Sequence, residues 1–310
     1  MKYWITVTLL AAVALSGCQP NGSNFTVDER GWPTVLRIGH NPPEEETQRM
    51  SRKEIYNALA QYLGKTLNID VEITKTGSYS IAIEAMRSKK IDICQFGSFS
   101  YLIAHEKADA EPLVIIGTEE SRHGAYQSYL ITSPSSGLNS MDDVLEKSKS
   151  LTFSFNDPAS TSGHLVPRGY FDSIGVKPEV VFGKVVYSMS HTANIMTALA
   201  GKVDVAAISS TTLARLVERG TIEESEFRVL WKSEWMPTGP FAVRGDLPSD
   251  FKQSIQDAFI NMHNDAPDTW ALVSSIYISD NPIFYRGDDT AYDYYRDIAR
   301  NMDQMQLLSD

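Results

Sequence analysis

The sequence predicts an α/β protein with two lobes around a ligand cleft. Strand-like and helix-like segments alternate over residues 35–96, and the same alternation returns over residues 151–208. This alternation is typical of parallel strands joined by helices. The chain has 310 residues, which is too many for one small core and suits two lobes of ordinary domain size.

The first unit has the order strand, helix, strand, helix, strand. Strands are predicted where apolar residues alternate or run on, and helices where they recur at helical spacing. The five elements in chain order are residues 35–39, 55–63, 70–74, 81–86 and 91–96.

The second unit repeats this order. Its elements are a strand at 151–155, a helix near 165–174, a strand at 180–186, a helix at 191–200 and a strand at 203–208. A strand at 241–244 and a helical tail, clearest at 251–263, follow. We therefore expect lobe 1 to hold residues 35–129 and 240–310, and lobe 2 to hold residues 130–239. Each lobe would be a mixed sheet flanked by helices.

Three hydroxyl side chains and a glycine stand where a helix is predicted to begin, in the run DPASTSG at residues 157–163. Backbone N–H groups in the first turn of a helix lack partners and carry partial positive charge, and hydroxyls add further donors. The run could enclose a tetrahedral oxyanion without a cationic side chain. An ordinary helix cap has the same composition, and Pro167 argues against one smooth helix from Ser160.

Small polar residues also follow two other predicted strands. Residues 97–101 follow the strand at 91–96, and residues 209–211 follow the strand at 203–208. Ligands of α/β sheets bind beyond the carboxyl ends of strands, where loops enter helices. Capping alone does not readily explain three such loops, so we expect them to line one cleft.

The N-terminal residues indicate export from the cytoplasm. A lysine at position 2 and an apolar stretch at 4–15 precede Leu-Ser-Gly-Cys, as in a secretory signal. The stretch is short for a membrane span, which needs about 20 residues. Cysteine after Leu-Ser-Gly resembles the bacterial lipobox, in which Cys18 is lipidated. Residues 1–17 would be the lipoprotein signal peptide, and residues 18–34 a tether on the periplasmic side or cell surface. An ordinary signal peptide with a nearby free cysteine is the alternative.

Charge and cysteine content exclude several classes of function. The net charge of −11 argues against nucleic acid as a partner. It also means that an anion site must work through local donors instead of long-range attraction. Beside Cys18 the chain has only Cys94, which cannot form an internal disulfide. Cys and His do not cluster at metal-ligand spacing. We expect no metal and no cofactor.

The ordered motifs between about residues 35 and 250 resemble the phosphate/phosphite/phosphonate-binding protein family, the periplasmic component of phosphonate-type ABC importers. They lie at 76–79, 91–101, 157–163, 190–191, 201–205 and 231–237. The run at 157–163 is the most specific. The resemblance implies the type II periplasmic-binding-protein fold and a monomer that binds a small oxyanion by lobe closure. It also implies ABC permease and ATPase subunits as partners, and no catalysis.

The resemblance further implies which residues bind the ligand. In that family the Ser-Thr-Ser run grips the phosphonate oxygens, while a tyrosine and a histidine also contact the ligand. The candidate ligand-binding residues are Tyr79, Phe96, Gly97, Ser98, Ser160, Thr161, Ser162, His191 and Asp204. Tyr79 could instead cover a lobe surface, and His191 could merely pack at a helix start. Asp204 more often anchors adjoining loops, because its carboxylate would repel an anion.

The chain departs from members of the family that bind aminoalkylphosphonates. Those members hold the ligand's ammonium group with acidic residues, and here Thr211 and Gly239 stand near the two positions. Burying an unpaired ammonium group would be costly. We therefore expect phosphite, methylphosphonate, phosphate or a related small oxyanion, although Glu119, Glu120 and Asp157 could substitute for the missing acids.

Two other functions remain open. Ser162, His191 and Asp204 could act as the nucleophile, base and orienting acid of a hydrolase. The run at 157–163 lacks, however, the strained Gly-x-Ser-x-Gly turn of α/β hydrolases. A binding protein that reports lobe closure to a membrane sensor kinase would have the same fold and would signal through that partner.

Overall fold

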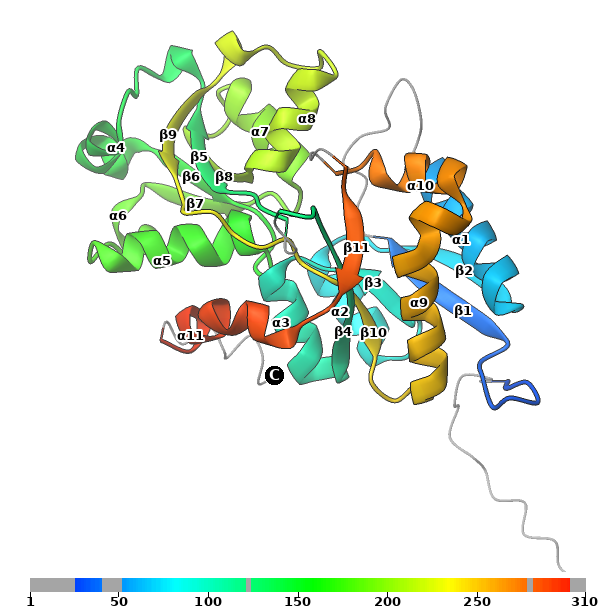
Figure 1. The fold of residues 1–310 in the computed structure, drawn as a ribbon. Helices are drawn as coiled ribbons and strands as arrows, with labels where there is room; N and C mark the ends of the chain where they lie inside the picture. Colours follow the sequence, from blue (N-terminus) through cyan, green and yellow to red (C-terminus); the bar gives the residue numbers. More distant parts are fainter. Residues whose placement is uncertain (1–25, 41–51, 121–123, 278–280, 302–310) are drawn as a thin grey trace, which may run out of the picture.

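Two lobes lie side by side, each with a central sheet covered by helices (Figure 1). The structure is a computed structural model and describes residues 26–40, 52–120, 124–277 and 281–301. Cys18 and most of the predicted tether lie outside these residues. None of the described helices is long and apolar enough to cross a membrane.

Lobe 1 contains a six-stranded mixed sheet. Across the sheet its strands are β11 (Ile283–Arg286), β4 (Ala110–Gly117), β10 (Phe241–Arg244), β3 (Ile93–Gln95), β1 (Val35–His40) and β2 (Asp70–Lys75). β1 pairs in parallel with β2 and β3, whereas β10 and β11 run antiparallel to their neighbours. The β1–β3 pairing confirms the predicted parallel unit.

Helices cover both faces of this sheet. They are α1 (Arg52–Leu67), α2 (Tyr79–Arg87), α3 (Ser98–Ala108), α9 (Ser249–Asp265), α10 (Pro267–Ser274) and α11 (Asp293–Asn301). Successive strand residues point to opposite faces, so Ile93 packs with α1, α9 and α10, while Cys94 packs with α2, α3 and α11. Trp32, at the end of the predicted tether, packs on Phe251 of α9 and donates a hydrogen bond to Asp250.

Lobe 2 contains a five-stranded mixed sheet. Across the sheet its strands are β7 (Lys184–Tyr187), β6 (Thr152–Phe155), β8 (Val205–Ser209), β5 (Ser128–Thr132) and β9 (Arg228–Lys232). Its helices are α4 (Met141–Lys147), α5 (Val166–Ser173), α6 (Pro178–Val181), α7 (His191–Leu199) and α8 (Ser210–Glu218). β6 is parallel to β7 and β8, and β5 is antiparallel to β8 and β9.

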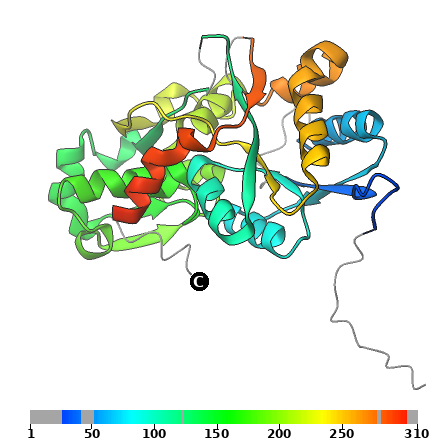
Figure 2. The same ribbon diagram turned by 60° about the horizontal axis from the view of Figure 1, so that its bottom comes forward.

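The described chain passes between the lobes in two crossing segments, residues 124–127 and 233–240. These segments are joined to each other: the N–H of Tyr126 donates to the carbonyl of Met236 at 3.0 Å, and the N–H of Met236 donates back at 2.8 Å. The last described helix, α11, follows β11 and lies across the junction of the lobes (Figure 2). Its buried face packs with residues of both α3 and the start of α5.

The structure corrects several predicted elements. The strand at 180–186 is wrong, because residues 178–181 form α6 and β7 begins only at Lys184. Pro178 stands in the first turn of α6, where its fixed φ is already helical. Residues 98–101 form the first turn of α3, and the tail contains β11 as well as helices. β5 begins at Ser128, just before the expected lobe limit at 129/130.

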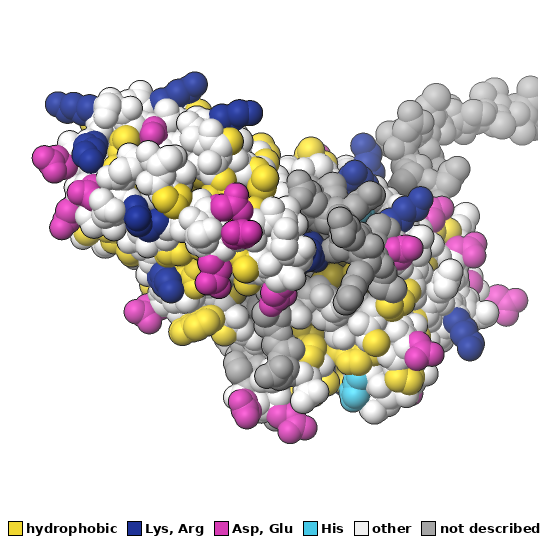
Figure 3. All heavy atoms as spheres, turned by 90° about the horizontal axis from the view of Figure 1, so that it is seen from above, with side chains coloured by type: hydrophobic (Ala, Val, Ile, Leu, Met, Phe, Trp, Pro, Cys, Tyr) yellow, Lys and Arg dark blue, Asp and Glu magenta, His cyan; other side chains and the backbone are white. Residues whose placement is uncertain are grey.

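Acidic and basic side chains are interspersed over the face seen from above (Figure 3). The described Lys and Arg side chains on that face form no continuous basic stripe of the kind that a nucleic acid needs (Figure 3). The described residues also contain no group of three or more His, Cys, Asp or Glu side chains that could hold a metal ion.

Candidate functional site

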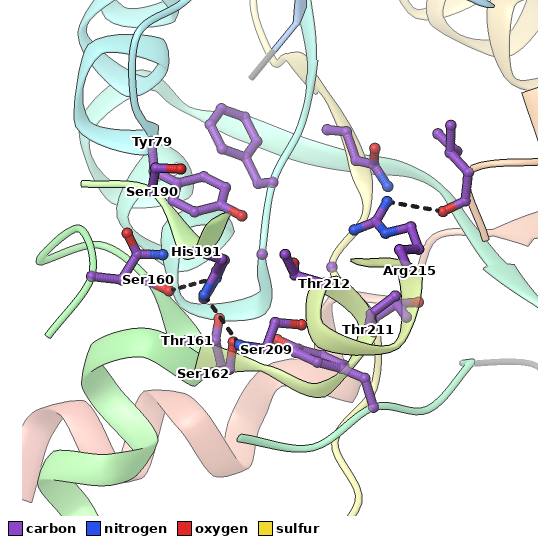
Figure 4. Close-up of a pocket in the computed structure, with 18 of the residues that line it drawn as sticks. Tyr79, Ser160, Thr161, Ser162, Ser190, His191, Ser209, Thr211, Thr212 and Arg215 are labelled. Carbon is purple, nitrogen blue, oxygen red and sulfur yellow. Dashed lines mark hydrogen bonds between the residues drawn. The ribbon is translucent and has the colours of Figure 1, made fainter. Parts of the chain in front are cut away.

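A pocket of about 160 Å³ lies between the lobes and is lined by residues of both. This volume is below the range of roughly 300–1,000 Å³ that is usual for drug-sized ligands. Lobe 1 contributes the start of α2 and the β3–α3 junction. Lobe 2 contributes the residues after β6 and the starts of α7 and α8 (Figure 4). The crossing segments contribute Tyr126, Thr238 and Gly239.

Residues 160–163, the hydroxyl turn, lie in the connection between β6 and α5 and are buried. A short π-helical segment, Thr161–Leu165, follows Ser160, and Pro167 stands in the first turn of α5. The predicted break at Pro167 is therefore confirmed. The Ser160 hydroxyl caps the turn by accepting the N–H of Gly163 at 3.0 Å. Because this bond uses a lone pair, the hydroxyl keeps its own hydrogen for donation.

Gly163 allows the turn to approach the end of β6. A Cβ atom at this position would lie 2.3 Å from the Cβ of Asn156. The N–H of Asn156 also donates to the carbonyl of Gly163 at 2.9 Å. Only glycine therefore fits here without displacing the backbone that positions Ser160.

Thr161 connects the hydroxyl turn to lobe 1. Its hydroxyl accepts the N–H of Phe99, in the first turn of α3, at 2.8 Å. The lobes are close at this point, since a Cβ on Gly97 of lobe 1 would lie 3.1 Å from the hydroxyl oxygen of Thr161. The carbonyl of Ser162 accepts the Ser128 hydroxyl at 2.6 Å.

The Tyr126 hydroxyl lies beside Thr161, Ser162 and Ser98. Burial raises the pKa of Tyr126 to about 12, against the lowering effect of hydrogen bonds with these three hydroxyls. The phenol therefore remains a hydrogen-bond donor at neutral pH. Ser98 is buried and is not among the residues that line the pocket. Its hydroxyl donates to the carbonyl of Pro237 at 2.9 Å.

His191 is the first residue of α7 and lies between Ser160 and Ser209 (Figure 4). Its Nδ1 accepts the backbone N–H of Ser209 at 3.1 Å, and its Nε2 is 3.5 Å from the Ser160 hydroxyl oxygen. A backbone N–H can only donate, so Nδ1 carries no hydrogen in this arrangement. His191 is therefore a neutral ring whose single N–H is on Nε2.

Of the candidates from lobe 1, Tyr79, Phe96 and Gly97 line the pocket. Tyr79 is the first residue of α2, and Ser78 caps this helix by accepting the N–H of Ile81. The next residue, Ser80, donates to Asp157 of lobe 2. The same helix start thus supplies a pocket side chain and a contact between the lobes.

Asp204 is not at the pocket. It precedes β8, and its carboxylate accepts the N–H of Thr152, the first residue of β6, at 2.7 Å. The hydroxyl turn follows the opposite, carboxyl end of β6, and Ser209 is the last residue of the parallel strand β8. Asp204 therefore anchors adjoining strands, and it is too remote to join Ser162 and His191 in a catalytic triad.

The described residues that line the pocket include no Asp or Glu. Thr211 and Gly239, which stand near the two positions that lack an acid in this sequence, do line the pocket. A Cβ on Gly239 would lie 2.1 Å from the carbonyl oxygen of Phe96, so no side chain fits there. Glu119, Glu120 and Asp157 lie outside the lining and do not replace the missing acids.

Sequence reasoning missed Tyr126, Asn156 and Arg215, which also line the pocket. Arg215 gives the pocket a cation, contrary to the expectation of a site without one. It donates to the carbonyl of Ile276 in lobe 1 at 3.2 Å. A signal for it was present, because Arg215 is four residues after Thr211 and the two share a face of α8.

Residues 42–280 match the family model described as "ABC transporter, phosphonate, periplasmic substrate-binding protein". The chain is 30% identical over 237 residues to the phosphonates-binding periplasmic protein of Escherichia coli (strain K12), covering 74% of this chain and 70% of that protein.

Two solved structures are similar to this one. One is a binding protein component of an ABC phosphonate transporter from Pseudomonas aeruginosa, with a TM-score of 0.77, 27% identity and coverage of 88% of this chain and 87% of the other. The other is PhnD1 from Prochlorococcus marinus (MIT 9301) in complex with methylphosphonate. Its TM-score is 0.73 at 21% identity, and the match covers 87% of this chain and 98% of the other.

Proposed function

Because this chain belongs to the family of periplasmic substrate-binding proteins of phosphonate ABC transporters, we propose that it binds a small tetrahedral phosphorus oxyanion between its lobes. It is the extracytoplasmic binding component of an importer. The candidate ligands are phosphite, methylphosphonate, phosphate and related phosphonates. The observation that carries the proposal is the group of donors formed by the hydroxyl turn and His191.

These donors are oriented before a ligand arrives. The hydroxyls of Ser160 and Thr161 each accept a backbone N–H, so their hydrogens are directed elsewhere. His191 accepts at Nδ1 and donates from Nε2. Hydrogen bonds to a charged acceptor are stronger than neutral ones, and donors that are already oriented bind at a smaller entropic cost. Tyr79, Phe96 and Gly97 would cover the ligand from lobe 1.

The lining favours ligands without a cationic group. No described lining residue is an Asp or Glu, and Gly239 leaves no space for a side chain. An ammonium group would therefore be buried without a carboxylate partner, which is unfavourable. Aminoethylphosphonate should bind more weakly than methylphosphonate.

Ligand binding would stabilise the closed arrangement of the lobes. A ligand held by the hydroxyl turn and Tyr79 contacts both lobes at once, so it binds the closed form more tightly than an open one. Permease and ATPase subunits of the importer would be the partners that recognise this form. We propose a monomer attached to the membrane by a lipid on Cys18.

Binding without catalysis is part of the proposal. A serine hydrolase needs an acid that accepts the N–H of the histidine Nδ1. Here Nδ1 accepts a backbone N–H from Ser209, and Asp204 is bound to Thr152.

Isothermal titration of the full-length protein, freed of carried-over ligand, tests the proposal. The ligands are methylphosphonate, phosphite, phosphate, 2-aminoethylphosphonate and sulfate. Tight binding of a small phosphorus oxyanion with weak binding of aminoethylphosphonate is expected. A preference for aminoethylphosphonate would contradict the argument from the missing acids, and no binding of any phosphorus oxyanion would overturn the ligand class.

A further inference from the structure

Asn156 has a buried acceptor that the protein leaves without a partner. This residue follows the last residue of β6, its side chain is 1% exposed, and it lines the pocket. Its side-chain oxygen Oδ1 makes no hydrogen bond to any described residue. A buried acceptor without a partner is unfavourable, so a ligand that satisfies it gains affinity.

The neighbouring polar groups can offer hydrogens to a ligand, because their accepting atoms are already used within the protein. Ser160 and Thr161 use their oxygens to accept backbone N–H groups, and His191 uses Nδ1 in the same way. A fully ionised oxyanion offers only acceptors, so it cannot satisfy Oδ1 of Asn156. A singly protonated phosphorus oxyanion offers one O–H group as well.

We infer that Oδ1 of Asn156 accepts a hydrogen bond from the O–H of a singly protonated phosphorus oxyanion. This inference rests on the proposed function. Asn156 would then be a specificity-determining residue, which selects the protonated form of the ligand. Sulfate has no proton to donate at neutral pH and would leave Oδ1 unpaired. The neutral amide of Asn156 would thus distinguish a protonated from a fully ionised oxyanion, in a pocket whose described lining contains no carboxylate.

Other titratable groups face this part of the pocket. The lining includes Tyr79, Tyr126, His191, Arg215 and Tyr277. Asp157 and His164 flank the hydroxyl turn, with Asp157 bonded to Ser80 and His164 bonded to Arg168. Protonation of His191 at low pH would also strengthen the binding of an anion. The test must therefore distinguish the effect of protonating the ligand from the effect of protonating the protein.

Calorimetric titration of the full-length protein with phosphite and methylphosphonate, between about pH 5.5 and pH 9, distinguishes the two effects by measuring how the affinity for each ligand depends on pH. The second ionisation of such groups lies near neutral pH, and that of phosphite occurs at lower pH than that of methylphosphonate. We expect affinity to fall about tenfold per pH unit above the second ionisation of each ligand. The decline should therefore begin at lower pH for phosphite.

A decline at the same pH for both ligands would assign the effect to the protein and overturn the inference. A pH-independent affinity would overturn it as well. Sulfate should bind weakly at every pH, and sulfate binding as tight as that of methylphosphonate would contradict it. Absence of binding by both phosphorus ligands would overturn the proposed function itself, which distinguishes the two failures.

Replacement of the amide provides a second readout. In Asn156→Ala we expect the preference for methylphosphonate over sulfate to shrink by about ten- to a hundredfold. Asn156→Asp should retain binding only of the protonated ligand, with a steeper loss as pH rises. Asn139→Ala, an exposed asparagine of lobe 2, is the matched control. An unchanged preference in folded Asn156→Ala protein would refute the inference, and the pH series on the natural chain tests it without any variant.

Discussion

The carboxylate of Asp157 in lobe 2 accepts two hydrogen bonds from Ser80 in lobe 1, from its hydroxyl at 2.9 Å and from its backbone N–H at 3.3 Å. Asp157 also accepts the N–H of Ala159 in its own turn at 2.8 Å. The carboxylate is fully buried. The Asp157 side chain thus connects the segment before the hydroxyl turn to α2, the helix that begins at Tyr79.

Ser80→Ala should weaken binding of methylphosphonate by on the order of tenfold, because it removes a hydrogen bond to a charged acceptor between the lobes. Titration calorimetry measures the affinity, and small-angle scattering measures how far the ligand compacts the protein. Ser88→Ala is the control, since the Ser88 hydroxyl bonds only within α2. Equal affinity in the two variants would show that the bond from the Ser80 hydroxyl to Asp157 does not contribute to ligand binding.

Thr161→Ala should reduce affinity for methylphosphonate by roughly ten- to a hundredfold, or about 1.5–3 kcal/mol. The variant loses a donor to the ligand and the acceptor of the Phe99 N–H. Thr197→Ala is matched to it, because that hydroxyl bonds only to carbonyls of α7. If Thr161→Ala bound the ligand as tightly as Thr197→Ala, the ligand would not be held by the hydroxyl turn.

Thr211→Asp should shift the binding preference of the pocket toward aminoalkylphosphonates. The new carboxylate would pair with the ligand's ammonium group, and it would repel an anion that lacks one. We expect 2-aminoethylphosphonate to gain at least about tenfold in affinity while methylphosphonate loses affinity. Thr221→Asp adds the same charge at an exposed position of lobe 2 outside the pocket lining. Similar effects of both substitutions would mean that only net charge had changed.

His164 makes the stability of the protein dependent on pH. Burial, together with the nearby Arg168 guanidinium, lowers the pKa of His164 from 6.5 to about 3. The unfolded chain therefore binds a proton below about pH 6.5 that the folded protein excludes. The free energy of unfolding should be highest above this pH and fall by up to about 1.4 kcal/mol per unit as pH decreases toward 3.

Urea unfolding between about pH 7 and pH 5 measures this slope. His164→Gln should reduce it, because glutamine does not titrate and can still accept the bond from Arg168 that His164 now accepts. His263→Gln, at a half-buried position of α9, is the control. An unchanged slope in His164→Gln would assign the acid sensitivity to other groups.

Local patterns predicted the parallel core of each lobe. The strand at 35–39, the strand at 151–155 and the helix at 191–200 differ from the observed elements by at most one residue at each end. Such segments show the apolar spacing of the face that they bury. The strand at 180–186 failed because its apolar residues belong partly to α6, where Pro178 begins a helix. Short apolar segments do not distinguish a strand from a helical turn.

The site was only partly accessible from the sequence. The hydroxyl turn and His191 stand in recognisable motifs, and the structure brings them together. Asp204 could not be excluded beforehand, because its place at the opposite end of β8 depends on strand direction and on the contact with Thr152. Tyr126 and Arg215 were missed because crossing segments and later helix turns reach a pocket only through the tertiary fold.

The reciprocal bonds between Tyr126 and Met236 have a mechanical consequence. Two separate linkers could each twist independently, which would let the lobes shear, roll or swing. Because the two crossing segments are bonded to each other, a rotation of one lobe about either segment would also displace the other segment. We therefore expect the lobes to move mainly by opening and closing about this joined pair, and different ligands would then be sensed through the same type of movement.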